Sequence, residues 1–161
     1  MISIALYKPD IPQNTASILR LCACFGLKTH IIEPCGFNLN DNRFKRVAMD
    51  YINHSSIIRY ESLKDLIKKN KKSRIILMST KGKKSLFKFK FKNNDMILLG
   101  RESKGVPEYV HDELQNVLKI PIASQTRSLN ISIAASIAAA EALRQIKRFW
   151  HGYRRKKIIF R

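Results

Sequence analysis

Three polar loops, each following a short apolar segment, carry the side chains of this sequence that are best suited to chemistry. They span residues 79–82, 100–105 and 123–127. Glycines in such loops allow a ligand to approach the backbone closely, because no Cβ stands in the way. In a doubly wound sheet, ligands bind outside the carboxyl ends of the strands. The three loops could therefore converge on one ligand pocket.

The last of these loops leads into a long helix. The sequence predicts a strand at 117–122, and Ser128-Leu129-Asn130 then opens a helix rich in alanine and isoleucine. Ser128 and Asn130 are suited to this position, since their side chains can accept hydrogen bonds from the first free N–H groups of a helix. The alternative to a ligand site is an ordinary capped strand–loop–helix unit.

The rest of the chain alternates strands and helices. Apolar runs predict strands at 2–7, 27–32, 57–60, 74–79 and 96–99, and helical patterns cover 12–26, 62–69 and 108–114, with a short basic segment at 41–47. Asn14 or Thr15 is the expected cap of the first helix, and Gly26 its end. Arg20, in the middle of that helix, would ordinarily be a solvated charge. The pattern predicts a doubly wound α/β domain with a mostly parallel sheet.

Residues 86–92, LFKFKFK, alternate apolar and basic side chains. This pattern is typical of an edge strand or an extended segment whose lysines face outward. We expect Phe87, Phe89 and Phe91 to pack on the core, following the usual burial preference of phenylalanine. Stacking on nucleic-acid bases is the functional alternative.

The charge balance points to a polyanionic partner. The 161 residues include 31 Lys and Arg but 12 Asp and Glu, which gives a net charge of +19. Nucleic acid is the partner that such an excess favours, although part of it reflects lysine abundance, as at 68–72. We expect one domain over 1–150 and a basic tail over 151–161. The tail could contact RNA or be a frayed terminus.

Metal chemistry and a membrane location are not expected. Cys22, Cys24 and Cys35 have no fourth ligand at zinc-like spacing and are predicted to be buried thiols, and the histidines are scattered. No apolar run reaches the length of a membrane span, and the first residues do not form a signal peptide. A cytoplasmic location follows as the expectation.

Three separated motifs together resemble the SpoU branch of the SPOUT superfamily of methyltransferases, and in particular its minimal TrmL type. They agree with the family in order and spacing over about residues 1–148. The motifs are IPQNT at 11–15 with RLCA at 20–23 and HIIEPCGF at 30–37, LGRESKGVP at 99–107, and IPI at 120–122 with RSLNIS at 127–132.

The resemblance implies a fold and a reaction. The fold would contain a deep trefoil knot in its C-terminal half, an exception to the rule that chains do not thread, and would form a homodimer. S-Adenosylmethionine would donate a methyl group to the ribose 2′-hydroxyl of the wobble nucleotide in the anticodon loop of tRNA, with no metal, membrane or further protein partner implied. By motif, the cofactor contacts would be Met78, Gly100, Glu102, Gly105, Ile120 and Ser128.

The resemblance also implies catalytic residues, namely Arg20, Asn14, Ser128 and Asn130. Arg20 matches the arginine that the family places near the reacting hydroxyl. A guanidinium stays protonated at physiological pH, so a role as free base is costly. We expect Arg20 to clamp a phosphate and orient the hydroxyl, with Asn14 holding Arg20 or the ribose and Glu102 ordering its loop.

The sequence departs from the family at Arg101, where the TrmL type usually has proline. This change leaves the loop conformation open. Two alternatives to a methyltransferase of the wobble nucleotide remain. One is a SpoU-type enzyme that acts on another tRNA or rRNA nucleotide, and the other is a non-catalytic RNA-binding module. Binding of S-adenosylmethionine separates the module from the enzymes.

Overall fold

The computed structural model describes residues 1–48 and 56–147. Strands and helices alternate along it, largely as the sequence predicts. In chain order the elements are β1 Ser3–Tyr7, α1 Pro12–Phe25, β2 Lys28–Ile32, α2 Asn42–Ala48, β3 Ile57–Tyr60, α4 Leu63–Lys69, β4 Ile75–Met78, β5 Lys84–Ser85, the 3₁₀ turn η1 Leu86–Lys88, β6 Met96–Leu99, α5 Glu108–Glu113, β7 Asn116–Lys119 and α6 Ile131–Gln145.

The strands form a seven-stranded sheet in the order β3-β2-β1-β6-β4-β7-β5. Neighbouring strands run parallel throughout the described residues. In the centre, Ala5 of β1 lies between His30 of β2 and Leu98 of β6. Strands β1 and β6 are buried along their whole length, as expected for a parallel sheet with both faces covered. The predicted α/β class with a mostly parallel sheet is confirmed.

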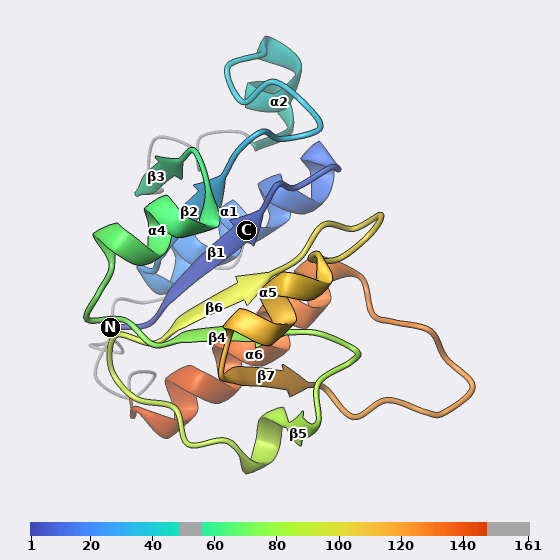
Figure 1. Ribbon diagram of the computed structural model, residues 1–161. Coiled ribbons are helices and arrows are strands. Elements are labelled where there is room, and N and C mark those ends of the chain that lie inside the picture. The colour runs from blue at the N-terminus through green and yellow to red at the C-terminus, as the bar shows by residue number, and fades with distance from the viewer. Residues whose placement is uncertain (49–55, 148–161) are drawn as a thin grey trace, which may run out of the picture.

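Helices cover both faces of the sheet (Figure 1). On one face, α1 and α6 pack on the sheet through small and branched residues such as Ile18, Cys22 and Ala138. On the other face, α4 and α5 bury Leu66 and Val110 against the sheet. The buried alanines of α6 lack bulk, so this helix can lie close to its neighbours, as its composition predicts.

The predicted cap of α1 is wrong. Ile11 occupies the N-cap position with no side-chain hydrogen bond, and Pro12 begins the helix. Proline suits this position because it has no N–H that would need a partner. Asn14 and Thr15 thus lie inside the first turn. Gly26 ends the helix in a left-handed conformation, as predicted, and Asn130 caps α6 by accepting from the N–H of Ser132.

The LFKFKFK segment forms no strand, so the edge-strand prediction is wrong. The turn η1 covers its first three residues, and Phe89 after it has an extended backbone. Phe91 is buried and Phe89 half-buried, so their expected packing is confirmed. Phe87 is 55% exposed, and its expected burial is wrong, because a 3₁₀ turn with three residues per turn breaks the period of two.

The cysteine prediction holds for one residue. Cys22 is buried, whereas Cys24 is exposed and Cys35 is half-buried. Burial raises the pKa of the Cys22 thiol to about 11.

Within residues 1–48 and 56–147, no helix is long and apolar enough to cross a membrane. The predicted basic tail at 151–161 lies outside the described residues.

Candidate functional site

A cavity of about 550 Å³ lies at the carboxyl ends of β4, β6 and β7. The amino-terminal ends of α1 and α6 close its other side. Its size is that of a small-molecule site, and its position is the one expected of a ligand site in a parallel sheet. The wall includes the chain around Ser79, the loop 100–105 and the residues just before α6.

Most of the residues predicted for the site line this cavity. These are Asn14, Met78, Gly100, Glu102, Gly105, Ile120, Ser128 and Asn130. They come from α1, from three strand ends and from the start of α6, which are far apart in the sequence. The fold therefore brings the separated motifs together.

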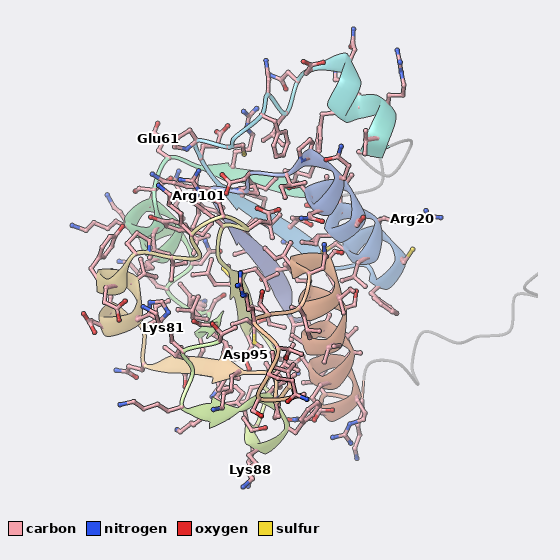
Figure 2. The ribbon with its side chains drawn as sticks, turned by 90° about the vertical axis from the view of Figure 1, so that its right-hand side faces the viewer. Arg20, Glu61, Lys81, Lys88, Asp95 and Arg101 are labelled. Carbon is pink, nitrogen blue, oxygen red and sulfur yellow. The ribbon has the colours of Figure 1, made fainter. Side chains whose placement is uncertain are left out.

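Arg20 and the loop 123–127 are the exceptions. Arg20 is exposed on α1 and does not line the cavity, and Figure 2 shows its side chain directed away from the molecule, on the side of α1 opposite Arg101. The loop 123–127 was expected in the pocket, but it is exposed and projects beside the sheet (Figure 1). The residues flanking this loop, Ile122 and Ser128, line the cavity in its place.

A chain of hydrogen bonds joins the three parts of the site. The Nδ2 of Asn14 donates to Oε1 of Glu102 at 3.1 Å, and the Nδ2 of Asn130 donates to Oδ1 of Asn14 at 3.0 Å. Asn130 in turn caps α6. Asn14, expected to hold Arg20 or a ribose, thus couples the loop 100–105 to the start of α6.

The second oxygen of Glu102 ties the same loop to the end of β1. It accepts a hydrogen bond from the backbone N–H of Asp10 at 2.9 Å. The expected role of Glu102 in ordering its loop agrees with these contacts. The carboxylate uses both oxygens to hold protein groups, so its geometry is fixed before any ligand arrives.

Arg101, the residue that departs from the family pattern, forms an ion pair with Asp10. Its Nε lies 3.0 Å from Oδ1 of that carboxylate, and Ser103 donates to the other oxygen through its hydroxyl. The Arg101 guanidinium, followed by the Ser103 hydroxyl, lowers the pKa of Asp10 to about 2. Asp10 therefore forms a charged brace between the loop 100–105 and the residues that follow β1.

Gly100 lets the loop close tightly on itself. A Cβ at this position would lie 2.8 Å from the carbonyl carbon of Gly105, a backbone atom. Arg101 and Gly105 form an antiparallel bridge with N–H donors at 3.1 and 2.9 Å. Gly105 has a φ of +66°, which glycine adopts without strain. Both glycines are therefore required by the cavity wall.

Sequence reasoning missed His111. Its Nε2 lies 2.9 Å from Oγ of Ser79 at the cavity wall, and its buried Nδ1 has no hydrogen-bond partner among the described residues. Nearby on the wall, the ammonium of Lys81 pairs with Glu108. The sequence gives no signal for these contacts, because they join the loop after β4 to α5 only in the folded chain.

The lining suits an amphiphilic ligand of nucleoside size. Met78, Leu99 and Ile120 offer an apolar surface, while the loop 100–105 and the start of α6 offer polar groups. Gly100 lets the loop 100–105 pack on its own backbone at Gly105, which shapes this part of the wall. Within the described part of the chain, no three His, Cys, Asp or Glu side chains are grouped to hold a metal ion.

Comparison with known proteins identifies relatives over nearly the whole chain. The model of the SpoU rRNA Methylase family matches residues 1–140. A protein of Beijerinckia indica named tRNA (cytidine(34)-2′-O)-methyltransferase is 43% identical over 147 residues, which cover 89% of this chain and 91% of that protein.

Solved structures agree with this likeness. One, described as giving structural insights into the 2-OH methylation of C/U34 on tRNA, has a TM-score of 0.86 and 36% identity, and covers 90% of this chain and 95% of that chain. An AdoMet-bound rRNA methyltransferase from Sinorhizobium meliloti has a TM-score of 0.80 at 22% identity, covering 89% of this chain and 56% of that chain. At this lower identity, the likeness supports the fold.

Proposed function

The chain belongs to the SpoU rRNA methylase family, and from this we propose that it transfers a methyl group from S-adenosylmethionine to the ribose 2′-hydroxyl of nucleotide 34, the wobble nucleotide, in tRNA. The observation that carries the proposal is the 43% identity, over nine-tenths of both chains, to a protein named for this reaction at cytidine 34. The cavity at the strand ends supports it, because it gathers the residues that the resemblance assigns to the cofactor.

The cavity fits the methyl donor. Bound there, S-adenosylmethionine would supply an electrophilic methyl group on a sulfonium, which an in-line displacement transfers to the ribose oxygen. Met78 and Ile120 would pack against its apolar parts, and the loop 100–105, which closes on itself at Gly100, would present its backbone to it. These residues orient the donor and exclude water around the reacting atoms.

Arg20 is proposed to hold the RNA phosphate next to the reacting ribose and to orient the 2′-hydroxyl. The proton of that hydroxyl would leave to the neighbouring phosphate or to water, since a guanidinium is a poor base. Asn14 and Asn130 would hold the start of α1 and the start of α6 together through their hydrogen bond. Ser128 lies on the wall, where its hydroxyl could face the donor.

We propose further that the enzyme is a homodimer in which Arg20 of one subunit serves the cavity of the other. Two observations support this arrangement. Arg20 lies outside the cavity of its own chain, about 9 Å along α1 from Asn14 at 1.5 Å per residue. In addition, exposed apolar side chains, including Phe25 and Ile133, lie on α1 and α6, a surface that a second copy could cover. A trefoil knot around the cavity and a cytoplasmic location complete the proposal.

Methyl transfer from labelled S-adenosylmethionine into unmodified tRNA tests the function. The product is digested with nucleases and the modified nucleotide is located by mass spectrometry. We expect a ribose methyl on nucleotide 34. A ribose methyl on another nucleotide would support the proposed reaction but refute nucleotide 34 as its target. If the chain neither transfers a methyl group nor binds the donor, an RNA-binding module is the remaining function.

The brace between Asp10 and Arg101 gives a second prediction. We expect Asp10→Asn to weaken S-adenosylmethionine binding about tenfold, because the loop 100–105 loses a charge-assisted bond that holds its shape. The pKa of Asp10 is depressed to about 2, so this carboxylate is ionised throughout the neutral range. Its stabilising contribution is complete above about pH 4 and is lost only as the pH falls toward 2.

Titration calorimetry at pH 6 and at pH 8 should therefore give the same weakening for Asp10→Asn. Asp65→Asn is the matched control, because Asp65 pairs with Lys69 on α4, away from the cavity. Equal affinities for Asp10→Asn and the parent chain would show that the brace is not needed for donor binding.

A further inference from the structure

We propose that a second surface, separate from the cavity, binds the tRNA through its phosphates and one unstacked base. We call it the β5 surface and define it by Lys83, Lys84, Lys88 and Lys119, together with Phe87, which lies between Lys84 and Lys88 in the sequence. The inference rests on the proposed function for the identity of the RNA, but it concerns residues outside the cavity wall.

The lysines of the β5 surface gather around one hollow. A shallow cavity of about 370 Å³ is lined by Lys83, Lys84, Ser85, Lys88 and Lys119. Lys83 directly precedes β5, Lys84 is on β5, and Lys88 and Lys119 end η1 and β7. All four lysines are exposed. Lys88 projects from the end of the molecule in Figure 2. A concave group of cations is suited to a phosphate backbone, whose counterions it displaces.

These charges are not neutralised by the protein. Across the described ranges, none of the four lysines forms an ion pair with a carboxylate. The sequence has no Asp or Glu from residue 80 to residue 94. By contrast, Lys81 is paired with Glu108 and Arg74 with Asp95, so we do not count them as part of the surface.

Phe87 lies on η1, directly before Lys88, and is exposed. Leu86 is fully buried, and the Ser85 hydroxyl accepts a hydrogen bond from the N–H of Phe87 at 3.3 Å. The turn is thus anchored directly before its aromatic residue, which stays 55% exposed. Phenylalanine is usually buried. An exposed aromatic ring beside cations is the combination that stacks single-stranded bases.

The β5 surface adjoins the cavity. Ser79 and Lys81 line the cavity, and Lys83 follows two residues later; Lys119 directly precedes Ile120 of the cavity wall. The two segments touch, because a Cβ on Gly82 would lie 2.5 Å from the carbonyl carbon of Leu118. An RNA chain with one ribose at the cavity could therefore continue onto the β5 surface.

Neutralising lysines tests the phosphate contacts. We expect K83Q/K84Q/K88Q to weaken tRNA binding at least about tenfold. The logarithm of the association constant falls as the logarithm of the salt concentration rises, and we expect the steepness of this fall to decrease by about 2. The matched control is K68Q/K71Q/K72Q, which removes the same charge from exposed lysines at and after the end of α4. These lysines precede the amino-terminal end of β4, whereas the cavity lies at its carboxyl end. Filter binding over a series of salt concentrations measures both quantities.

Changing Phe87 tests the stacked base. We expect Phe87→Leu to weaken tRNA binding about tenfold, since leucine is apolar but has no π face. Phe87→Tyr should bind as the parent chain does. Both variants should bind S-adenosylmethionine normally, because Phe87 does not line the larger cavity.

The outcomes separate this inference from the proposed function. If both lysine variants lose affinity equally, or neither does, the β5 surface is refuted while methylation of nucleotide 34 can still stand. If Phe87→Leu binds like Phe87→Tyr, the stacked base is refuted. If the parent chain methylates no tRNA but binds it through the β5 surface, the proposed reaction fails and the RNA contact stands.

Discussion

Arg20→Ala is expected to abolish methyl transfer to tRNA and to leave the affinity for S-adenosylmethionine nearly unchanged. Arg20 does not line the cavity, so the donor site should survive its removal. The reacting hydroxyl would lose the cation that orients it, and removal of one such group from a transition state slows a reaction by about a hundredfold to a thousandfold. Single-turnover rates with saturating tRNA measure the loss.

Two further variants isolate the role of Arg20. Arg20→Lys keeps the charge but not the planar fork that binds phosphate through two donors, so we expect only part of the rate to return. Arg59→Ala is the control, because Arg59 is an exposed arginine on β3, the strand at the edge of the sheet away from the cavity. Turnover by Arg20→Ala within tenfold of the parent rate would contradict the assignment.

The parts of the fold that the sequence predicts correctly are those decided by local pattern. The apolar runs of β1, β4 and β6 are long enough for buried strands and are followed by polar residues, so their type and position follow from the chain alone. Gly26 and Asn130 end and begin their helices through backbone geometry and capping, which act within a few residues. The location of the cavity then follows from the parallel sheet.

The sequence predictions fail where contacts between residues far apart in the chain determine the position of a side chain or loop. Asn14 has a side chain suited to capping, but its partners are Glu102 and Asn130, which no local pattern relates to it. Phe87 follows the alternation of its neighbours in sequence, yet the turn η1 changes its direction. The loop 123–127 is polar like the other two loops, but only the residues that flank it reach the cavity.

Arg101 shows how a local departure can be balanced by a distant residue. The sequence alone leaves the loop conformation open at this position. In the fold, Asp10 and Ser103 complete an ion pair and hydrogen bonds that hold the loop. Asp10 precedes the first family motif by one residue, so this compensation is visible only when the end of β1 and the loop 100–105 are seen side by side.

Gly100→Val is expected to weaken the binding of S-adenosylmethionine by about a hundredfold. Even a Cβ would meet the carbonyl carbon of Gly105 at 2.8 Å and its Cα at 2.9 Å. These are backbone atoms held by the bridge between Arg101 and Gly105, so they cannot move without opening the loop. Overpacking typically costs about 1–3 kcal/mol for a few added carbons, and a clash with fixed backbone lies at the upper end of this range. If the loop must open to relieve the clash, that upper end corresponds to a loss of roughly 150-fold in donor affinity.

Calorimetry measures the binding, and thermal unfolding checks that the variant folds. Ala123→Val is the control, because it enlarges an exposed side chain in the loop that does not line the cavity. Donor affinity of Gly100→Val within tenfold of the parent chain would show that the backbone at Gly100 does not form the donor site.

Mixing Gly100→Val with Arg20→Ala then decides how the subunits share the site. Each variant alone is expected to be inactive. If Arg20 serves the cavity of the other subunit, a mixed dimer contains one competent site: an intact cavity from the Arg20→Ala chain and an intact arginine from the Gly100→Val chain. Random exchange makes about half of the dimers mixed, so the mixture should recover about a quarter of the parent activity. Mixed dimers isolated by two different tags that remain inactive would instead place Arg20 at the cavity of its own chain.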